Sequence, residues 1–213
     1  MTGRAAGRPR AFDRDDALRQ AAHLFWRYGF SGTTTRMLTA CVGISSSSLY
    51  AAFGTKSALF EEAVRTYAKR YSAIYDRALQ ESTIDAVIER LFVESVTEFT
   101  RTAEGHPGCL TTSAVMSDSS ATLDVREYVI ELQRSDQQRL LDRLEQAADE
   151  GMFADSVDPA ALAELIHTIW QGLSTRAELG ASRAELLSAA ALAATFIAGT
   201  MNTVVNFRSE AYG

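Results

Sequence analysis

The chain has 213 residues, enough for one small and one medium-sized domain, and its hydrophobic content of 46% supports a packed core. No window approaches the apolar length that spans a bilayer, and the start lacks the apolar stretch of a secretory signal. We therefore expect a cytoplasmic protein that makes no membrane contact. Its two cysteines, Cys41 and Cys109, stand far apart, which argues against a structural disulfide.

Charge is divided unevenly between the two parts of the chain. The formal net charge of −6 would by itself argue against a nucleic-acid-binding protein. Residues 1–60, however, hold eight Lys and Arg against three acids, a net +5, while the remainder holds 13 against 24, a net −11. We expect a basic head that binds DNA phosphates and an acidic body that stays off the duplex.

Residues 1–11 form a basic arm with Arg4, Arg8 and Arg10 and no acidic residue. Such a segment is expected to be disordered without a partner. Since it precedes a DNA-reading element, Arg8 and Arg10 are predicted to enter a neighbouring minor groove. The alternative is a solubilising tail that contacts nothing.

Residues 34–53 have the pattern of a helix-turn-helix element. Thr33 or Thr34 can cap the first helix, and Gly43 can adopt the positive φ that a reversal within a few residues often requires. Ser45 follows as the natural N-cap of the second helix. Thr55 then caps a third helix.

The second helix has two different sides. Leu49 and Phe53 lie on one side, while Ser46, Ser47 and Tyr50 lie on the other. These hydroxyl-bearing side chains have little reason to face a core and suit base edges and phosphate oxygens in a major groove. Lys56, in the first turn of the next helix, opposes the helix dipole, and a bound anion would reconcile the two.

The stretch from about Phe12 to Phe60 resembles the TetR-type (TetR/AcrR) bacterial transcriptional regulators. The matching residues are Ala21-x-x-Leu24-Phe25, Gly29-Phe30, Thr33-Thr34-Thr35-Arg36, Gly43-Ile44-Ser45, Leu49-Tyr50-x-x-Phe53, Lys56 and Ala58-Leu59-Phe60. The resemblance implies DNA contacts from Ser45, Ser46, Ser47 and Tyr50 of the second helix, and phosphate contacts from Thr35, Arg36 and Lys56. Many relatives carry a lysine at Ser46 and a histidine at Ala52, so this reading face is poor in charge.

The fold is predicted to be all-α, because only three prolines occur and no run alternates as a strand does. It comprises a three-helix DNA-binding domain over residues 12–60 and a helical ligand-binding and dimerisation domain over residues 61–213. The expected helices run from an Asp13 cap through Phe25, from Lys56 to Leu79, from Ile84 to Phe99, from Val125 through Leu144 to a close at Gly151, from an Asp158 cap through Leu173, and from Arg183 to Val205, with a short segment from Leu110 to Met116.

The last two helices are predicted to pair with their copies in a second subunit. The final helix is apolar on more than one side, which a terminal helix needing one buried face would not require. We expect a four-helix interface, as in TetR-type relatives, formed by Leu165, Ile169, Leu173, Leu186, Ala189, Ala193 and Phe196. The alternative is a final helix fully enclosed by its own domain.

The resemblance also implies an effector pocket in the body, suited to a small apolar or aromatic molecule. Its candidate lining residues are Phe92, Val96, Phe99, Met116, Tyr128, Leu132, His167 and Trp170, each of which core packing would also explain. Cys109 follows a Gly/Pro turn near a helix start, a place that favours thiolate, so it is a candidate thiol sensor. The alternative for Cys109 is a small buried hydrophobe.

An enzyme is not expected. The three histidines stand on separate segments, and neither a metal-ligand cluster nor a phosphate loop appears, so we predict no metal and no cofactor. The sequence therefore predicts a homodimeric repressor that a small-molecule inducer releases from a near-palindromic operator in double-stranded DNA. The alternative is a ligand- or electrophile-sensing helical protein with a degenerate DNA reader.

Overall fold

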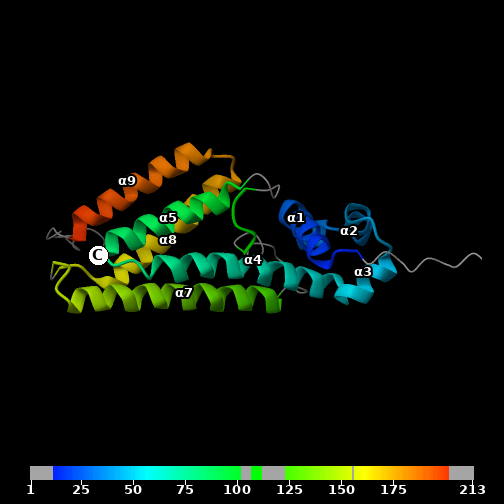
Figure 1. The fold of residues 1–213 in the computed structure, drawn as a ribbon, viewed down its shortest axis with the longest axis horizontal. Coiled ribbons are helices and arrows are strands. Elements are labelled where there is room, and N and C mark those ends of the chain that lie inside the picture. Colours follow the sequence, from blue (N-terminus) through cyan, green and yellow to red (C-terminus); the bar gives the residue numbers. More distant parts are fainter. Residues whose placement is uncertain (1–11, 102–106, 112–122, 155, 202–213) are drawn as a thin grey trace, which may run out of the picture.

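The computed structural model describes residues 12–101, 107–111, 123–154 and 156–201, and every regular element in these ranges is an α-helix. The predicted all-α fold is confirmed. The molecule is elongated, with a small head at one end and a larger body at the other (Figure 1). The basic arm of residues 1–11, with Arg8 and Arg10, lies outside the described residues.

The head consists of α1 (Arg14–Gly32), α2 (Thr35–Val42) and α3 (Ser46–Phe53). The predicted caps are present: Asp13, Thr34 and Ser45 each accept a hydrogen bond from backbone N–H groups in the first turn of their helix. Gly43 ends α2 with a φ of 74°, the left-handed conformation that glycine adopts without a Cβ clash. The turn chemistry thus places α3 across the end of α2.

Helix α4 (Lys56–Ala78) joins the head to the body without a break (Figure 1). Thr55 caps it, and its 23 residues span about 35 Å at about 1.5 Å per residue. The head half buries Phe60 and Val64, whereas the body half buries Tyr71 and Tyr75. A movement of this helix in the body is therefore carried directly into the head.

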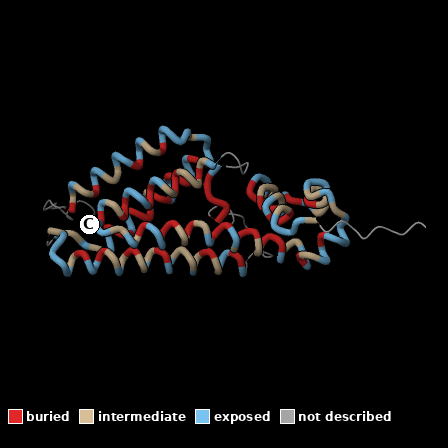
Figure 2. Tube along the Cα trace, in the orientation of Figure 1, coloured by how far each residue is buried: buried red, intermediate tan, exposed pale blue. Residues whose placement is uncertain are grey.

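The body contains α5 (Ile84–Phe99), α7 (Leu123–Asp149), α8 (Pro159–Glu178) and α9 (Arg183–Met201). Helix α5 packs against α4, α8 and α9, while α7 packs against α4 and α8. The expected N-cap Asp158 accepts from the Ala160 N–H at 2.9 Å. Buried residues line the inward sides of α4 and α5, whereas α9 exposes much of its length (Figure 2).

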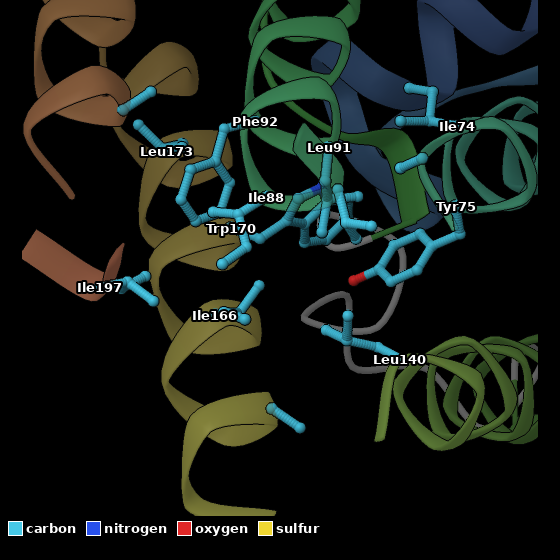
Figure 3. Packing of buried hydrophobic residues seen from close by; sticks show 14 of the residues in the cluster. Ile74, Tyr75, Ile88, Leu91, Phe92, Leu140, Ile166, Trp170, Leu173 and Ile197 are labelled. Carbon is cyan, nitrogen blue, oxygen red and sulfur yellow. The ribbon is translucent and has the colours of Figure 1, made fainter. Parts of the chain in front are cut away.

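The described residues form two apolar clusters, and the head's cluster reaches past the predicted boundary at residue 60. It includes Tyr67 of α4 and three residues of the body, Leu110, Val125 and Val129. The second cluster fills the body around Trp170 (Figure 3). Head and body therefore share packed side chains as well as a continuous helix.

One expectation about α9 was wrong. By length and composition, Arg183–Met201 is long and apolar enough to cross a membrane, although the sequence was expected to hold no such window. Two faces of this helix carry Leu and Ala, and only 22% of its most apolar window is buried in the protomer. The helix was expected to continue to Val205, but residues beyond Met201 lie outside the described part.

Candidate nucleic-acid interface and effector cavity

The outer face of α3 is exposed and rich in hydroxyl groups. Leu49 and Phe53 are buried in the head, so Ser46, Ser47 and Tyr50 project away from it, as predicted. Ser45 has a different role, because its Oγ accepts the Ser48 N–H at 3.1 Å and lies 2.9 Å from the Ser47 Oγ. Ser45 therefore fixes the start of the helix while its neighbours stay accessible.

Tyr50 is held by the preceding helix. Its hydroxyl lies 2.5 Å from the Thr35 Oγ1 in the first turn of α2. This hydrogen bond joins two residues that the sequence predicted to contact DNA and sets the direction of the phenol. Arg36, the next residue of α2, is exposed and can reach an anion at this surface.

Lys56 has partners within the protein. Its ammonium group donates to the carbonyls of Phe30 and Thr33, both at 3.0 Å, and lies 4.2 Å from the centre of the Phe30 ring. The carbonyl oxygens, rather than a bound anion, offset the unfavourable position of a lysine at a helix N-terminus. This corrects the expected phosphate contact: Lys56 clamps the α1–α2 connection to α4.

Helix α9 presents large apolar side chains to solvent. Leu192 is 72% exposed and Phe196 is 68% exposed, while Leu165 of α8 is 41% exposed. Among the predicted interface residues Ala189 is exposed and Ile169 and Ala193 are half-buried. Leu173 and Leu186 are buried in the protomer's own core, so they are withdrawn from the predicted interface, which gains Leu192.

A cavity lies inside the body between α4, α7 and α8. Its free volume is about 20 Å³, which is enough for about one water molecule. The lining residues are Ala68, Tyr71, Tyr75, Thr111, Val129, Leu132, Gln133, Asp136, His167 and Trp170. The cavity is therefore nearly closed, and a larger guest requires its walls to separate.

Three of the predicted pocket residues, Leu132, His167 and Trp170, line this cavity. Val96 and Phe99 do not, because the inward face of α5 is buried in the body core, where the Phe99 ring lies 5.2 Å from Trp170. Phe92 lines a separate groove between α5 and α9.

The other two predicted pocket residues lie elsewhere. Tyr128 packs against the head cluster beneath Arg65, whose guanidinium carbon lies 3.8 Å from the ring centre. Met116 lies outside the described residues.

Polar side chains of the cavity wall are only partly satisfied. The Tyr75 hydroxyl lies 3.4 Å from the His167 Nδ1, and the Tyr71 hydroxyl donates to the Gly108 carbonyl at 3.5 Å, near the limit for a hydrogen bond. Burial raises the pKa of both phenols and lowers the pKa of His167, so all three are uncharged at neutral pH. Burial also raises the pKa of Asp136, against hydrogen bonds from Ser72 and Arg139.

Cys109 is buried in the body core, and its Sγ lies 2.7 Å from the Thr111 Oγ1. A thiol that solvent does not reach is poorly placed to react with an oxidant. Cys41 is exposed, and both cysteines are free.

Comparisons with known proteins agree with this arrangement. The model of bacterial regulatory proteins of the tetR family matches residues 17–63, and that of the tetracyclin repressor-like C-terminal domain matches residues 87–193. The chain belongs to the TetR family of bacterial regulatory proteins. It is a helix-turn-helix transcriptional regulator.

Individual relatives of this TetR-family regulator cover nearly its whole length. The transcriptional repressor ComR of Escherichia coli K12 is 29% identical over 189 residues, which are 88% of this chain and 90% of ComR. The repressor BdcR of the same organism is 27% identical over 190 residues, 89% of this chain and 91% of BdcR. A cysteine-substituted CifR complexed with 26-base-pair operator DNA has a TM-score of 0.77 at 31% identity, covering 89% of this chain and 98% of CifR.

Sequence reasoning missed Tyr71 and Tyr75 as cavity residues of the TetR-family regulator. Both were expected to be buried, since they belong to the apolar stripe of α4. The signal that could have singled them out is two phenols four residues apart on the body half of this stripe, because a buried Tyr hydroxyl usually needs a partner. The partner His167 stands 92 residues beyond Tyr75, so no local pattern connects them.

Substitution of Lys56 and of Arg36 should separate a clamp from a phosphate contact. We expect Lys56→Met to lower the free energy of unfolding by about 1.5–3 kcal/mol, because two carbonyls lose a charged donor. The slope of log affinity against log salt should not change. Arg36→Ala should leave stability within about 0.5 kcal/mol and reduce that slope by about 0.9 for each phosphate that the protein no longer neutralises.

Chemical denaturation and DNA titrations at several salt concentrations measure both quantities. A reduced salt slope in Lys56→Met with unchanged stability would restore the phosphate role.

Proposed function

We propose that this TetR-family regulator is a homodimeric repressor that binds a near-palindromic operator with α3 and is released by a small molecule in the body cavity. The observation that carries this proposal is the exposed hydroxyl-bearing face of α3, with Tyr50 held by Thr35. Ser46, Ser47 and Tyr50 are proposed to contact bases and phosphates in the major groove, and Arg36 to bind phosphate. Arg8 and Arg10 are proposed to follow the adjoining minor groove.

Exposure of Leu192 and Phe196 supports a dimer built on α8 and α9. Two such side chains on one protomer leave an apolar surface that a second copy can cover, and a C2 pairing brings identical faces together. A dimer also places two copies of α3 for successive major grooves about 34–36 Å apart. The operator should accordingly have two similar half-sites.

The sign of regulation is proposed to be negative. Occupancy of a promoter is sufficient to block transcription, and ComR and BdcR are described as repressors. Release requires a ligand that binds one conformation better than the other. A nearly closed cavity beside the continuous helix α4 supports such a difference, because a guest that needs more room favours an opened body.

Selection of DNA sites from a random pool with the purified full-length protein tests the proposal. We expect a site with two related half-sites, binding by two protomers and an affinity that falls with salt. Chromosomal sites recovered in cells would place the protein on the chromosome in the cytoplasm. Binding without sequence preference would instead support the degenerate reader, a candidate because Ser46 and Ala52 replace charged residues common in relatives.

Tyr50→Phe should weaken binding to the selected operator. The substitution removes the hydrogen bond to Thr35 and any bond from this hydroxyl to DNA, a loss of about 0.5–1.5 kcal/mol per subunit. For a dimer, the affinity should therefore fall about fivefold or more. Fluorescence anisotropy with labelled operator measures the effect.

Tyr128→Phe is the matched control, because Tyr128 lies beneath Arg65 and away from α3. Equal affinities for the two variants would remove Tyr50 from the reading face.

A further inference from the structure

The cavity in the body carries information about the charge of its guest. None of the described residues that line it is lysine or arginine, so an anion would find no cation in the wall. Asp136 is the charged lining residue, and its two oxygens already accept from Ser72 at 2.9 Å and from Arg139 at 3.3 Å. The carboxylate is thus matched within the protein, and a cationic guest would meet Arg139 beside it.

Two hydroxyl groups in the wall lack strong partners. The Tyr71 and Tyr75 hydroxyls are buried, and their contacts of 3.5 and 3.4 Å lie well beyond the usual O–H···O and O–H···N distances. Thr111 differs, because its Oγ1 is already 2.7 Å from the Cys109 Sγ. A guest oxygen between the two phenols would supply the acceptor that their buried O–H groups require.

The remaining wall suits a flat apolar group. The Trp170 ring stacks with His167 at 5.8 Å between centroids, and the Tyr71 ring meets it edge-on at 5.9 Å. Figure 3 shows Tyr75 extending from α4 toward α8, with its hydroxyl directed into the space between Trp170 and Leu140. Aromatic edges and faces in this arrangement favour an inserted ring.

We propose that the cavity takes a small uncharged molecule with a planar apolar body and a carbonyl or hydroxyl oxygen, which the Tyr71 and Tyr75 hydroxyls bind beside Trp170. This inference rests on the proposed function, since it names the chemical class of the effector. Anionic effectors such as carboxylates and acyl-nucleotides are excluded by the same lining. The free volume of about 20 Å³ means that such a guest enters only when the walls separate.

Three probes of similar size separate charge from shape: acetophenone, benzoate and benzylamine. Each is titrated into the DNA-free, full-length protein by calorimetry at neutral pH. We expect acetophenone to bind at least about tenfold more tightly than either ion, because burial of an unmatched charge is unfavourable. Tyr75→Phe should weaken acetophenone binding about two- to tenfold, the effect of one hydrogen bond.

Two controls keep this test separate from folding and from DNA binding. Tyr28→Phe removes a hydroxyl from a tyrosine that is 45% exposed on α1, so it should bind acetophenone as the unsubstituted protein does. Circular dichroism establishes that the variants fold. A failed operator selection would overturn the proposed repressor but leave the calorimetric preference intact.

Tighter binding of benzoate or benzylamine than of acetophenone would overturn the assignment of an uncharged effector. So would the absence of binding by all three probes, or an equal loss in Tyr28→Phe and Tyr75→Phe.

Discussion

Replacement of Leu192 and Phe196 together by glutamate is expected to dissociate the dimer and to lower operator affinity by about a hundredfold or more. These side chains are 72% and 68% exposed on the protomer, so the substitution leaves its own core intact. Covering a large apolar side chain contributes about 1.5–3 kcal/mol, and a dimer covers two from each subunit. Four unmatched carboxylates in their place would add the cost of burying charge.

Operator affinity depends on this interface because each subunit reads one half-site. A monomer retains one copy of α3 and no longer binds the second half-site, where each base contact is worth a discrimination of the order of a kilocalorie per mole or more. Sedimentation velocity gives the mass of the assembly, and anisotropy gives the affinity for the selected operator. Met152→Glu is the matched control, since Met152 is 47% exposed in the turn between α7 and α8.

We expect the control to remain a dimer with unchanged operator affinity. A double variant that still sediments as a dimer would show that the exposed face of α9 is not the contact between subunits. A monomeric variant with undiminished affinity would separate assembly from DNA reading and overturn the geometry of two half-sites.

Local chemistry was sufficient to predict most of the helices. Asp13, Thr34, Ser45 and Thr55 cap helices because their oxygens lie within one turn of the amides they satisfy, a property that short sequence windows contain. Gly43 follows the same logic, since its positive φ belongs to the turn itself. The reading face of α3 followed from the burial of Leu49 and Phe53 on the opposite side.

The partners of individual side chains could not be predicted in this way. Periodicity identified Phe99 and Trp170 as inward-facing residues, but not which of them would adjoin a void and which would be packed on every side. The same limit applies to Lys56, whose acceptors on Phe30 and Thr33 are 26 and 23 residues away. Leu186 was placed on an outer face because α9 is apolar around most of its circumference, so its pattern does not distinguish two buried sides.

Leu110→Ala is expected to lower the free energy of unfolding by about 2–5 kcal/mol and to weaken the coupling between cavity and head. Leu110 is 1% exposed and packs in the head cluster with Val125 and Val129, although all three belong to the body segment of the chain. Its neighbour Thr111 and the same Val129 line the cavity. A guest that displaces this wall therefore presses directly on side chains that hold the head.

Denaturation at a fixed protein concentration measures the loss of stability, and operator titrations with and without acetophenone measure the coupling. Leu110→Met conserves volume and should cost less than about 1.5 kcal/mol while the response to acetophenone persists. If Leu110→Ala loses stability as expected but its operator affinity still responds fully to acetophenone, the signal does not pass through Leu110. Helix α4, which buries Tyr71 and Tyr75 in the body and Phe60 and Val64 in the head, would then carry it alone.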